Sequence, residues 1–127
     1  MKRAVLAIRN RLVLEAVTNA LKRAGFFVEK SSSQETERIL TLTNALAATT
    51  LVMDVTRSGD GTFDMRMNTA REARRRNPEI KIALLCDNVS DESSAYKVKC
   101  AKEDGSIDAF FYESVPPDYL ADAIDAL

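Results

Sequence analysis

Charged and polar residues follow several short apolar runs in this sequence, and Asp54 is the most distinctive of them. It ends the run 51–54 (LVMD), where three large apolar residues precede one carboxylate. In sheets of parallel strands covered by helices, functional groups gather beyond the carboxyl ends of the strands. The residues expected at such ends are Arg9, Asn10, Arg11, Ser31, Ser32, Ser33, Asp54, Asp60, Asp87, Asn88, Tyr112, Glu113 and Ser114.

Several kinds of active site are excluded by what the sequence lacks. There is no histidine, which removes the Ser-His-Asp and Cys-His machineries and the usual zinc and haem ligand sets. The glycines at 59 and 61 lack the spacing of a dinucleotide-binding turn, and no P-loop motif is present. Cys86 and Cys100 do not form a CxxC pair, and we interpret both as idle thiols. We therefore expect no metal, no cofactor and no enzymatic activity.

The size and charge of the chain favour a single ordinary domain. It has 127 residues, 46% of them hydrophobic and 29% charged, with 18 basic and 19 acidic residues and a formal net charge of -1. A nucleic-acid or membrane-surface module normally carries a basic excess, so we expect contact with neither. Because Arg9 and Arg11 interrupt the apolar N-terminal run, it is too short for a signal peptide or a membrane span, and we expect a cytoplasmic protein.

Strand-like and helix-like apolar patterns alternate along the whole chain. Buried strands are predicted at 4–8, 26–28, 51–55, 80–86 and 107–112. Helices are predicted between them. The first has Asn10 as an N-cap and Gly25 at its end, and the second opens with Ser32 and Glu35 as a capping box. The third stops at Asn77-Pro78, the fourth is predicted from Ser90 to Asp104, and the last opens at Pro116 or Pro117. The inner face of the last helix is expected to hold Leu120, Ile124 and Leu127.

This alternation predicts an α/β fold: a doubly wound, five-stranded parallel sheet of flavodoxin-like order, (βα)5, with helices on both faces in three α/β/α layers. The domain is expected to span residues 1–127. Because the last expected helix stops at the final residue, we interpret the chain as the N-terminal part of a longer regulator, with a natural end as the alternative.

The element order, the strand 51–54 and the segments 72–82 (EARRRNPEIKI) and 105–110 (GSIDAF) resemble the receiver domain of two-component response regulators. The resemblance covers essentially the whole chain. It implies that Asp54 holds the position of the phosphoacceptor. The acidic pair that holds magnesium in the family falls at Ile8 and Arg9 here.

Other positions also depart from the family. Its Ser or Thr after the fourth strand corresponds to Asp87, and its lysine after the fifth corresponds to Tyr112 and Glu113. The pocket would therefore hold Arg9, Asn10, Asp87, Asn88, Tyr112 and Glu113 around Asp54. Two interpretations of Arg9 stay open: a built-in cation that replaces magnesium, and a solvated arginine. The run Arg71, Arg74, Arg75 and Arg76 is interpreted as a solvated helix end.

These departures favour an atypical, pseudo-receiver signalling module that works by protein–protein interaction. The resemblance to the receiver family implies that the contact surface is formed by the fourth helix, fifth strand and fifth helix. Its expected partner is another protein or a fused output domain, with a homodimer as an alternative. A second hypothesis is a working phosphoacceptor in which a histidine kinase phosphorylates Asp54. A third is a small-molecule-binding or enzymatic domain on the same scaffold, because fold alone does not settle function.

Overall fold

A computed structural model describes residues 1–87 and 92–127, in which five strands alternate with five helices. A 3-10 helix at Gly59–Gly61 precedes the third long helix. The strands are β1 (Arg3–Ala7), β2 (Phe27–Lys30), β3 (Thr50–Val55), β4 (Lys81–Cys86) and β5 (Ala109–Tyr112). The helices are α1 (Arg11–Arg23), α2 (Thr36–Leu46), α3 (Phe63–Arg76), α4 (Glu92–Glu103) and α5 (Pro117–Asp125).

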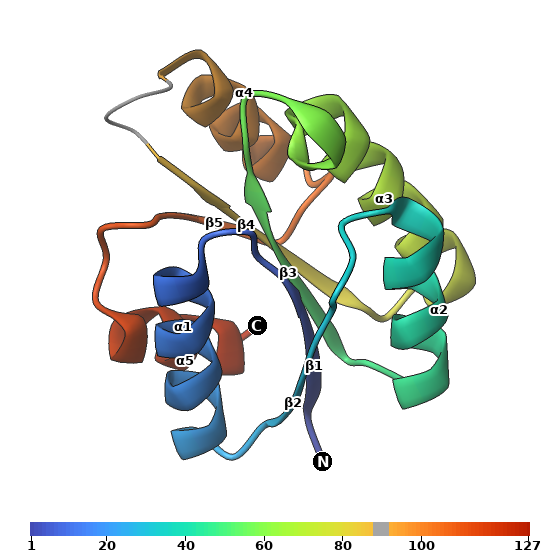
Figure 1. Cartoon of the computed structure of the whole chain (residues 1–127), viewed down its shortest axis with the longest axis vertical. Coiled ribbons are helices and arrows are strands. Elements are labelled where there is room, and N and C mark those ends of the chain that lie inside the picture. The colour runs from blue at the N-terminus through green and yellow to red at the C-terminus, as the bar shows by residue number, and fades with distance from the viewer. Residues whose placement is uncertain (88–91) are drawn as a thin grey trace.

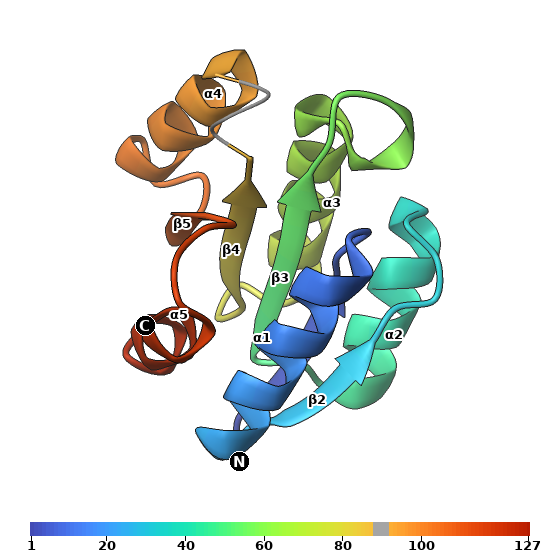
Figure 2. The same ribbon diagram turned by 60° about the vertical axis from the view of Figure 1, so that its left-hand side comes forward.

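All five strands run parallel in one sheet of order β2-β1-β3-β4-β5, as the flavodoxin-like prediction requires (Figure 2). From β1 the chain first forms the edge strand β2 on one side of β1 and then β3, which pairs with the other side of β1. The carboxyl ends of β1 and β3 are therefore neighbours, with Ala7 opposite Met53. This is the topological switch point, where such sheets place their sites.

Helices cover both faces of the sheet, as predicted. Figure 1 shows α1 and α5 on one face and α2, α3 and α4 on the other. Each face has its own apolar core: Leu6, Val52 and Leu85 point toward α1 and α5, while Met53 and Leu84 belong to the second core. Because the central strands are buried on both faces, they read as continuous apolar runs in the sequence.

Most of the predicted helix ends are confirmed. The side chain of Asn10 accepts hydrogen bonds from the main-chain N–H groups of Leu12 and Val13, which caps α1. Gly25 follows the end of α1 with a φ of 95°, a left-handed conformation that favours glycine. The third helix stops before Asn77, and α5 opens at Pro117. The helix predicted from Ser90 is described from Glu92 onward, and its expected start lies outside the described residues.

Two predictions about helix ends are wrong. Ser32 and Glu35 do not form a capping box, because Ser33 Oγ accepts the Glu35 N–H and Ser31 Oγ donates to the carbonyl of Ser33. These local hydrogen bonds satisfy main-chain N–H and C=O groups ahead of the helix, which begins only at Thr36. Leu127 follows the end of α5 and is 40% exposed, so it does not belong to the inner face of that helix.

The arginine-rich end of α3 is only partly solvated, which corrects the prediction for Arg74. This side chain donates to the carbonyl oxygens of Gly105 and Ser106, both at 3.1 Å, and pairs with Asp108. It therefore ties α3 to the connection before β5. No helix within residues 1–87 and 92–127 is long and apolar enough to cross a bilayer.

Candidate functional site

A cavity of about 440 Å3 lies at the carboxyl ends of the central strands. Five of the predicted site residues line it, which are Arg9, Asn10, Asp54, Asp87 and Glu113, together with Val55, Thr56 and Arg57. The fold thus brings together residues from four separate connections of the chain. The predicted residue Asn88 lies outside the described residues.

Tyr112 does not line this cavity. Its ring packs edge to face against Phe110, with ring centroids 5.4 Å apart, and the residue is half-buried at the end of β5. Phe110 and Tyr112 both pack against the core beneath α2, α3 and α4. This geometry assigns Tyr112 to the edge of the core.

Asp54 is buried at the end of β3, with only 2% of its side chain exposed. One carboxylate oxygen, Oδ2, accepts the main-chain N–H of Arg9 at 2.9 Å. The other, Oδ1, accepts from the guanidinium of Arg66 at 2.9 Å. Both oxygens therefore already have donors inside the protein, and one of those donors is a cation.

Arg66 enters this corner from α3 and is itself fully buried. Its Nε donates to the main-chain carbonyl of Asp54 at 2.8 Å, and its Nη2 lies 3.0 Å from the carbonyl oxygen of Ala7 and 2.5 Å from Oε1 of Gln34. Burial lowers the pKa of the Arg66 guanidinium, and the adjacent Asp54 opposes that effect. Because arginine is not deprotonated in proteins, the group remains a cation.

The structure bears on the two interpretations of Arg9. The cation that pairs with Asp54 is Arg66, not the side chain of Arg9. What Arg9 supplies to Asp54 is its main-chain N–H, while its Nη1 lies 3.4 Å from the carbonyl oxygen of Ser58. Arg9 is exposed, so its side chain is closer to the solvated interpretation.

Two further carboxyl groups, those of Asp87 and Glu113, line the cavity with Asp54. Burial raises the pKa of the Glu113 carboxyl, and the charges of Asp54 and Asp87 raise it further. These carboxyl groups sit close enough to disfavour additional negative charge between them. A phosphoryl group here would bring about two negative charges into the same space.

Two residues of this network, Arg66 and Gln34, were missed from the sequence. Arg66 carried a readable signal, because it lies on the same helical face as Phe63, Met67 and Ala70. A cation among inward-facing apolar residues requires a buried acidic partner. Gln34 carried no such signal, since it lies in a polar connection among serines.

No family model and no curated protein matches this sequence. Solved structures do match it over almost its whole length. A receiver domain protein from Clostridium thermocellum is 16% identical, with a TM-score of 0.76 and coverage of 99% of this chain and 93% of that one. The response regulator TrrA from Thermotoga maritima, in complex with Mg2+-BeF, is 18% identical, with a TM-score of 0.73 and coverage of 99% and 98%.

A two-component response regulator of the LuxR family from Aurantimonas sp. is 23% identical, with a TM-score of 0.73 and coverage of 98% of this chain and 82% of that one. This chain has the receiver-domain fold. Within that fold, Asp54 ends the central strand and faces the switch point.

Magnesium does not fit the donor set of this receiver fold. The ion prefers several oxygen ligands, chiefly carboxylates and water. Ile8 and Arg9 follow β1, and both oxygens of Asp54 already accept hydrogen bonds. Among the residues that the structure describes, no three His, Cys, Asp or Glu side chains are grouped to hold a metal ion.

Proposed function

We propose that this chain is a receiver-like regulatory module that works through protein contacts and does not use magnesium-dependent phosphorylation of Asp54. The observation that carries the proposal is the buried ion pair between Asp54 and Arg66. A phosphoacceptor must present a free carboxylate oxygen to its donor. Here one oxygen is bound by a cation and the other by a main-chain N–H, and the side chain is almost inaccessible.

The carboxyl groups of Asp87 and Glu113, which line the cavity with Asp54, support the same proposal. Glu113 already has a raised pKa because of burial and the charges of Asp54 and Asp87. Phosphorylation would add negative charge to this group of carboxylates with no magnesium ligand set to offset it. The product would therefore be disfavoured as well as the approach of the donor.

The proposed contact surface consists of α4, β5 and α5. Tyr96 on α4 is 69% exposed, and Tyr119 on α5 is 63% exposed. Tyrosine is enriched at protein interfaces because it combines an apolar ring with a polar end. The partner would be another protein, an output domain on the same polypeptide or a second copy of the chain. A partner that binds one conformation more tightly than another would shift the balance between them.

Intact-mass spectrometry after incubation with acetyl phosphate and magnesium tests the proposal. We expect no gain of a phosphoryl group under conditions that phosphorylate a competent receiver domain. A gain that disappears in Asp54→Asn would contradict the proposal and favour the phosphoacceptor hypothesis. A gain that persists in Asp54→Asn would place the modification elsewhere and leave Asp54 unmodified, as proposed.

A further inference from the structure

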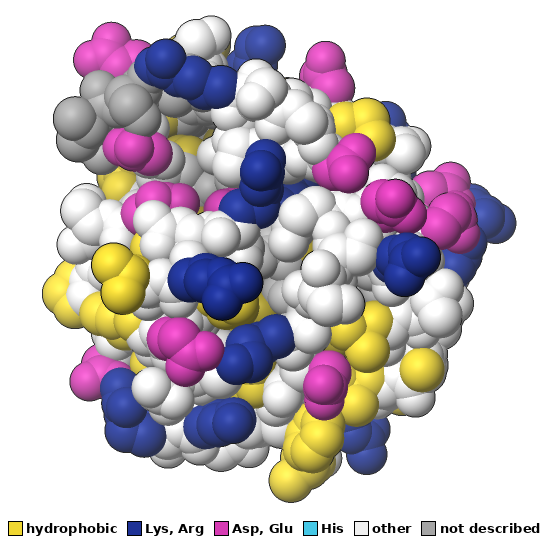
Figure 3. Space-filling model, in the orientation of Figure 1, with side chains coloured by type: hydrophobic (Ala, Val, Ile, Leu, Met, Phe, Trp, Pro, Cys, Tyr) yellow, Lys and Arg dark blue, Asp and Glu magenta, His cyan; other side chains and the backbone are white. Residues whose placement is uncertain are grey.

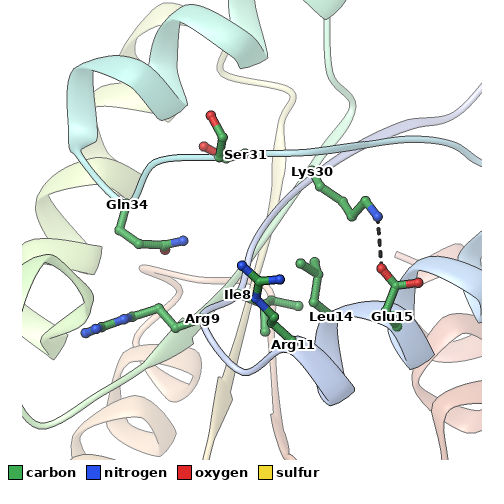
Figure 4. A pocket seen from close by; sticks show the side chains of 9 residues that line it. Ile8, Arg9, Arg11, Leu14, Glu15, Lys30, Ser31 and Gln34 are labelled. Atoms are coloured by element: carbon green, nitrogen blue, oxygen red, sulfur yellow. Dashed lines mark hydrogen bonds and ion pairs between the residues drawn. The ribbon is translucent and has the colours of Figure 1, made fainter.

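A second cavity, of about 580 Å3, opens beside the first on the other side of the β1–α1 connection (Figure 4). Its walls come from the end of β1, the first turns of α1 and the connection between β2 and α2. Among the described residues, Arg9 is the one that lines both this cavity and the cavity near Asp54. The lining residues are Ile8, Arg9, Arg11, Leu14, Glu15, Lys30, Ser31, Ser32 and Gln34.

The lining of this second cavity is cationic. Arg9, Arg11 and Lys30 stand against the single carboxylate of Glu15. In Figure 3 a column of Lys and Arg side chains runs down the middle of the face that carries α1. A concave site with an excess of one charge concentrates ligands of the opposite charge.

Arg11 is the cation in this cavity that is available to a ligand. Lys30 is already paired with Glu15 at 3.0 Å, and Nη1 of Arg9 is turned to the carbonyl of Ser58. Across residues 1–87 and 92–127, the side chain of Arg11 has no hydrogen bond or ion pair. Figure 4 shows its guanidinium rising into the space beneath Ser31 and beside Gln34.

Gln34 presents the donor end of its amide to the same space. Its Oε1 accepts from Arg66 at 2.5 Å, and a guanidinium only donates, so the amide orientation is fixed. The NH2 group is therefore the end left for the cavity, and Figure 4 shows it on the side that faces Arg11. Through this contact Arg66, the buried cation beside Asp54, determines that Gln34 presents a hydrogen-bond donor to the second cavity.

We propose that this cavity binds the phosphate group of a small phosphorylated metabolite, with Arg11 and the Gln34 amide as its donors. A guanidinium offers two parallel N–H groups that match two oxygens of a phosphate, and the amide supplies a further donor. The exposed Ser32 hydroxyl stands at the rim. The volume lies within the range of small-molecule sites, so the remainder of a nucleotide-sized molecule can be held beside Leu14. This binding does not depend on the proposed function, because Asp54 takes no part in it.

Titration of the 15N-labelled protein with AMP and, separately, with inorganic phosphate tests the proposal. Both are run with EDTA at constant ionic strength, and amide shifts are followed by NMR. We expect saturable shifts in the β1–α1 and β2–α2 connections, with the Arg66 Nε–H resonance moving as well. Tighter binding of AMP than of phosphate identifies a phosphate ester as the ligand, and equal binding identifies free phosphate. No saturable shift, or equal binding of citrate, overturns the proposal.

Two variants of α1 localise the effect. Arg11→Gln removes the available cation and is expected to weaken AMP binding at least tenfold. Lys22→Gln removes the same charge from the exposed far end of the helix and is expected to change the dissociation constant less than twofold. Equal weakening by the two variants would indicate general charge attraction and overturn the site. The titration contains no metal ion and no phosphodonor, so Asp54 cannot be phosphorylated in it. A failure to bind AMP therefore counts against this cavity alone and not against the proposed function.

Discussion

The Nη2 atom of Arg66 lies 2.9 Å from Oδ1 of Asp54, and both side chains are buried. The pair is not isolated, because Arg66 also bonds to the main-chain carbonyl groups of Asp54 and Ala7. One side chain of α3 thus connects the ends of β1 and β3, where the receiver fold has its switch point. Of its three nitrogens, only Nη1 lacks a partner within the described part of the chain.

Replacing Arg66 by methionine is expected to lower the free energy of unfolding by about 3–5 kcal/mol, because it leaves the buried carboxylate of Asp54 without its cation. Urea unfolding followed by circular dichroism measures this change. Arg71→Met, an exposed arginine on the same helix, is the control, with an expected change within about 0.5 kcal/mol. Similar losses in the two variants would contradict the central role of the buried pair.

The two substitutions Arg9→Ala and Arg9→Pro separate the main chain from the side chain at this position. Alanine keeps the N–H that Asp54 accepts, so we expect the free energy of unfolding to change by no more than about 0.5 kcal/mol. Proline removes that N–H and leaves one carboxylate oxygen unsatisfied, which is expected to cost about 1–3 kcal/mol. The same urea experiment applies. An alanine variant as unstable as the proline variant would restore a structural role to the Arg9 side chain.

The raised pKa of Glu113 predicts a pH dependence of stability. The folded protein holds this proton to a higher pH than the unfolded chain does. Stability contributed by the protonated form is therefore lost as the pH rises from the ordinary glutamate pKa, about 4.3, through the raised value. Glu113→Gln removes that loss, so the variant should be the more stable protein at neutral pH.

Because Glu113 is partly exposed, solvent screening limits the gain to less than about 1 kcal/mol. Thermal unfolding between pH 4 and pH 8 measures the difference between variant and parent, which should shrink toward the acid end of the range. Glu79→Gln, in an exposed turn, is the matched control. A gain for Glu113→Gln that is independent of pH would rule out this electrostatic origin.

Arg74→Gln is expected to reduce the free energy of unfolding by about 1–3 kcal/mol, because Arg74 pairs with Asp108 and holds two carbonyl groups of the connection before β5. Asp108 also accepts the main-chain N–H of Ile82, so it links β4 to the same network. Arg75→Gln removes only a surface pair with Glu72 and should leave the urea midpoint almost unchanged. Equal urea midpoints for the two variants would contradict this distinction.

Most of the fold could be predicted because the sheet is buried on both faces. Runs such as 82–86 are apolar without interruption, and their alternation with helical patterns indicates a parallel sheet covered by helices on both faces. The error at the start of α2 lies where polar side chains compete locally for main-chain groups. The serines at 31 and 33 delay the start of α2, and nothing in the apolar pattern reports that competition.

The candidate site could be predicted only in part, because strand ends identify which residues gather but not which of them pair. Arg9, Asp54 and Glu113 share a cavity as expected. The cation that neutralises Asp54 comes instead from a helix twelve residues further along the chain. Choosing between Arg9 and Arg66 requires the direction of the Arg66 side chain, which depends on how α3 lies against the sheet.

A cation that belongs to the polypeptide cannot be diluted, chelated or exchanged. In the corner where β1 and β3 end, the positive charge is present as soon as α3 has packed, at a fixed stoichiometry of one. Its presence is therefore determined at translation and is independent of the ionic content of the surroundings.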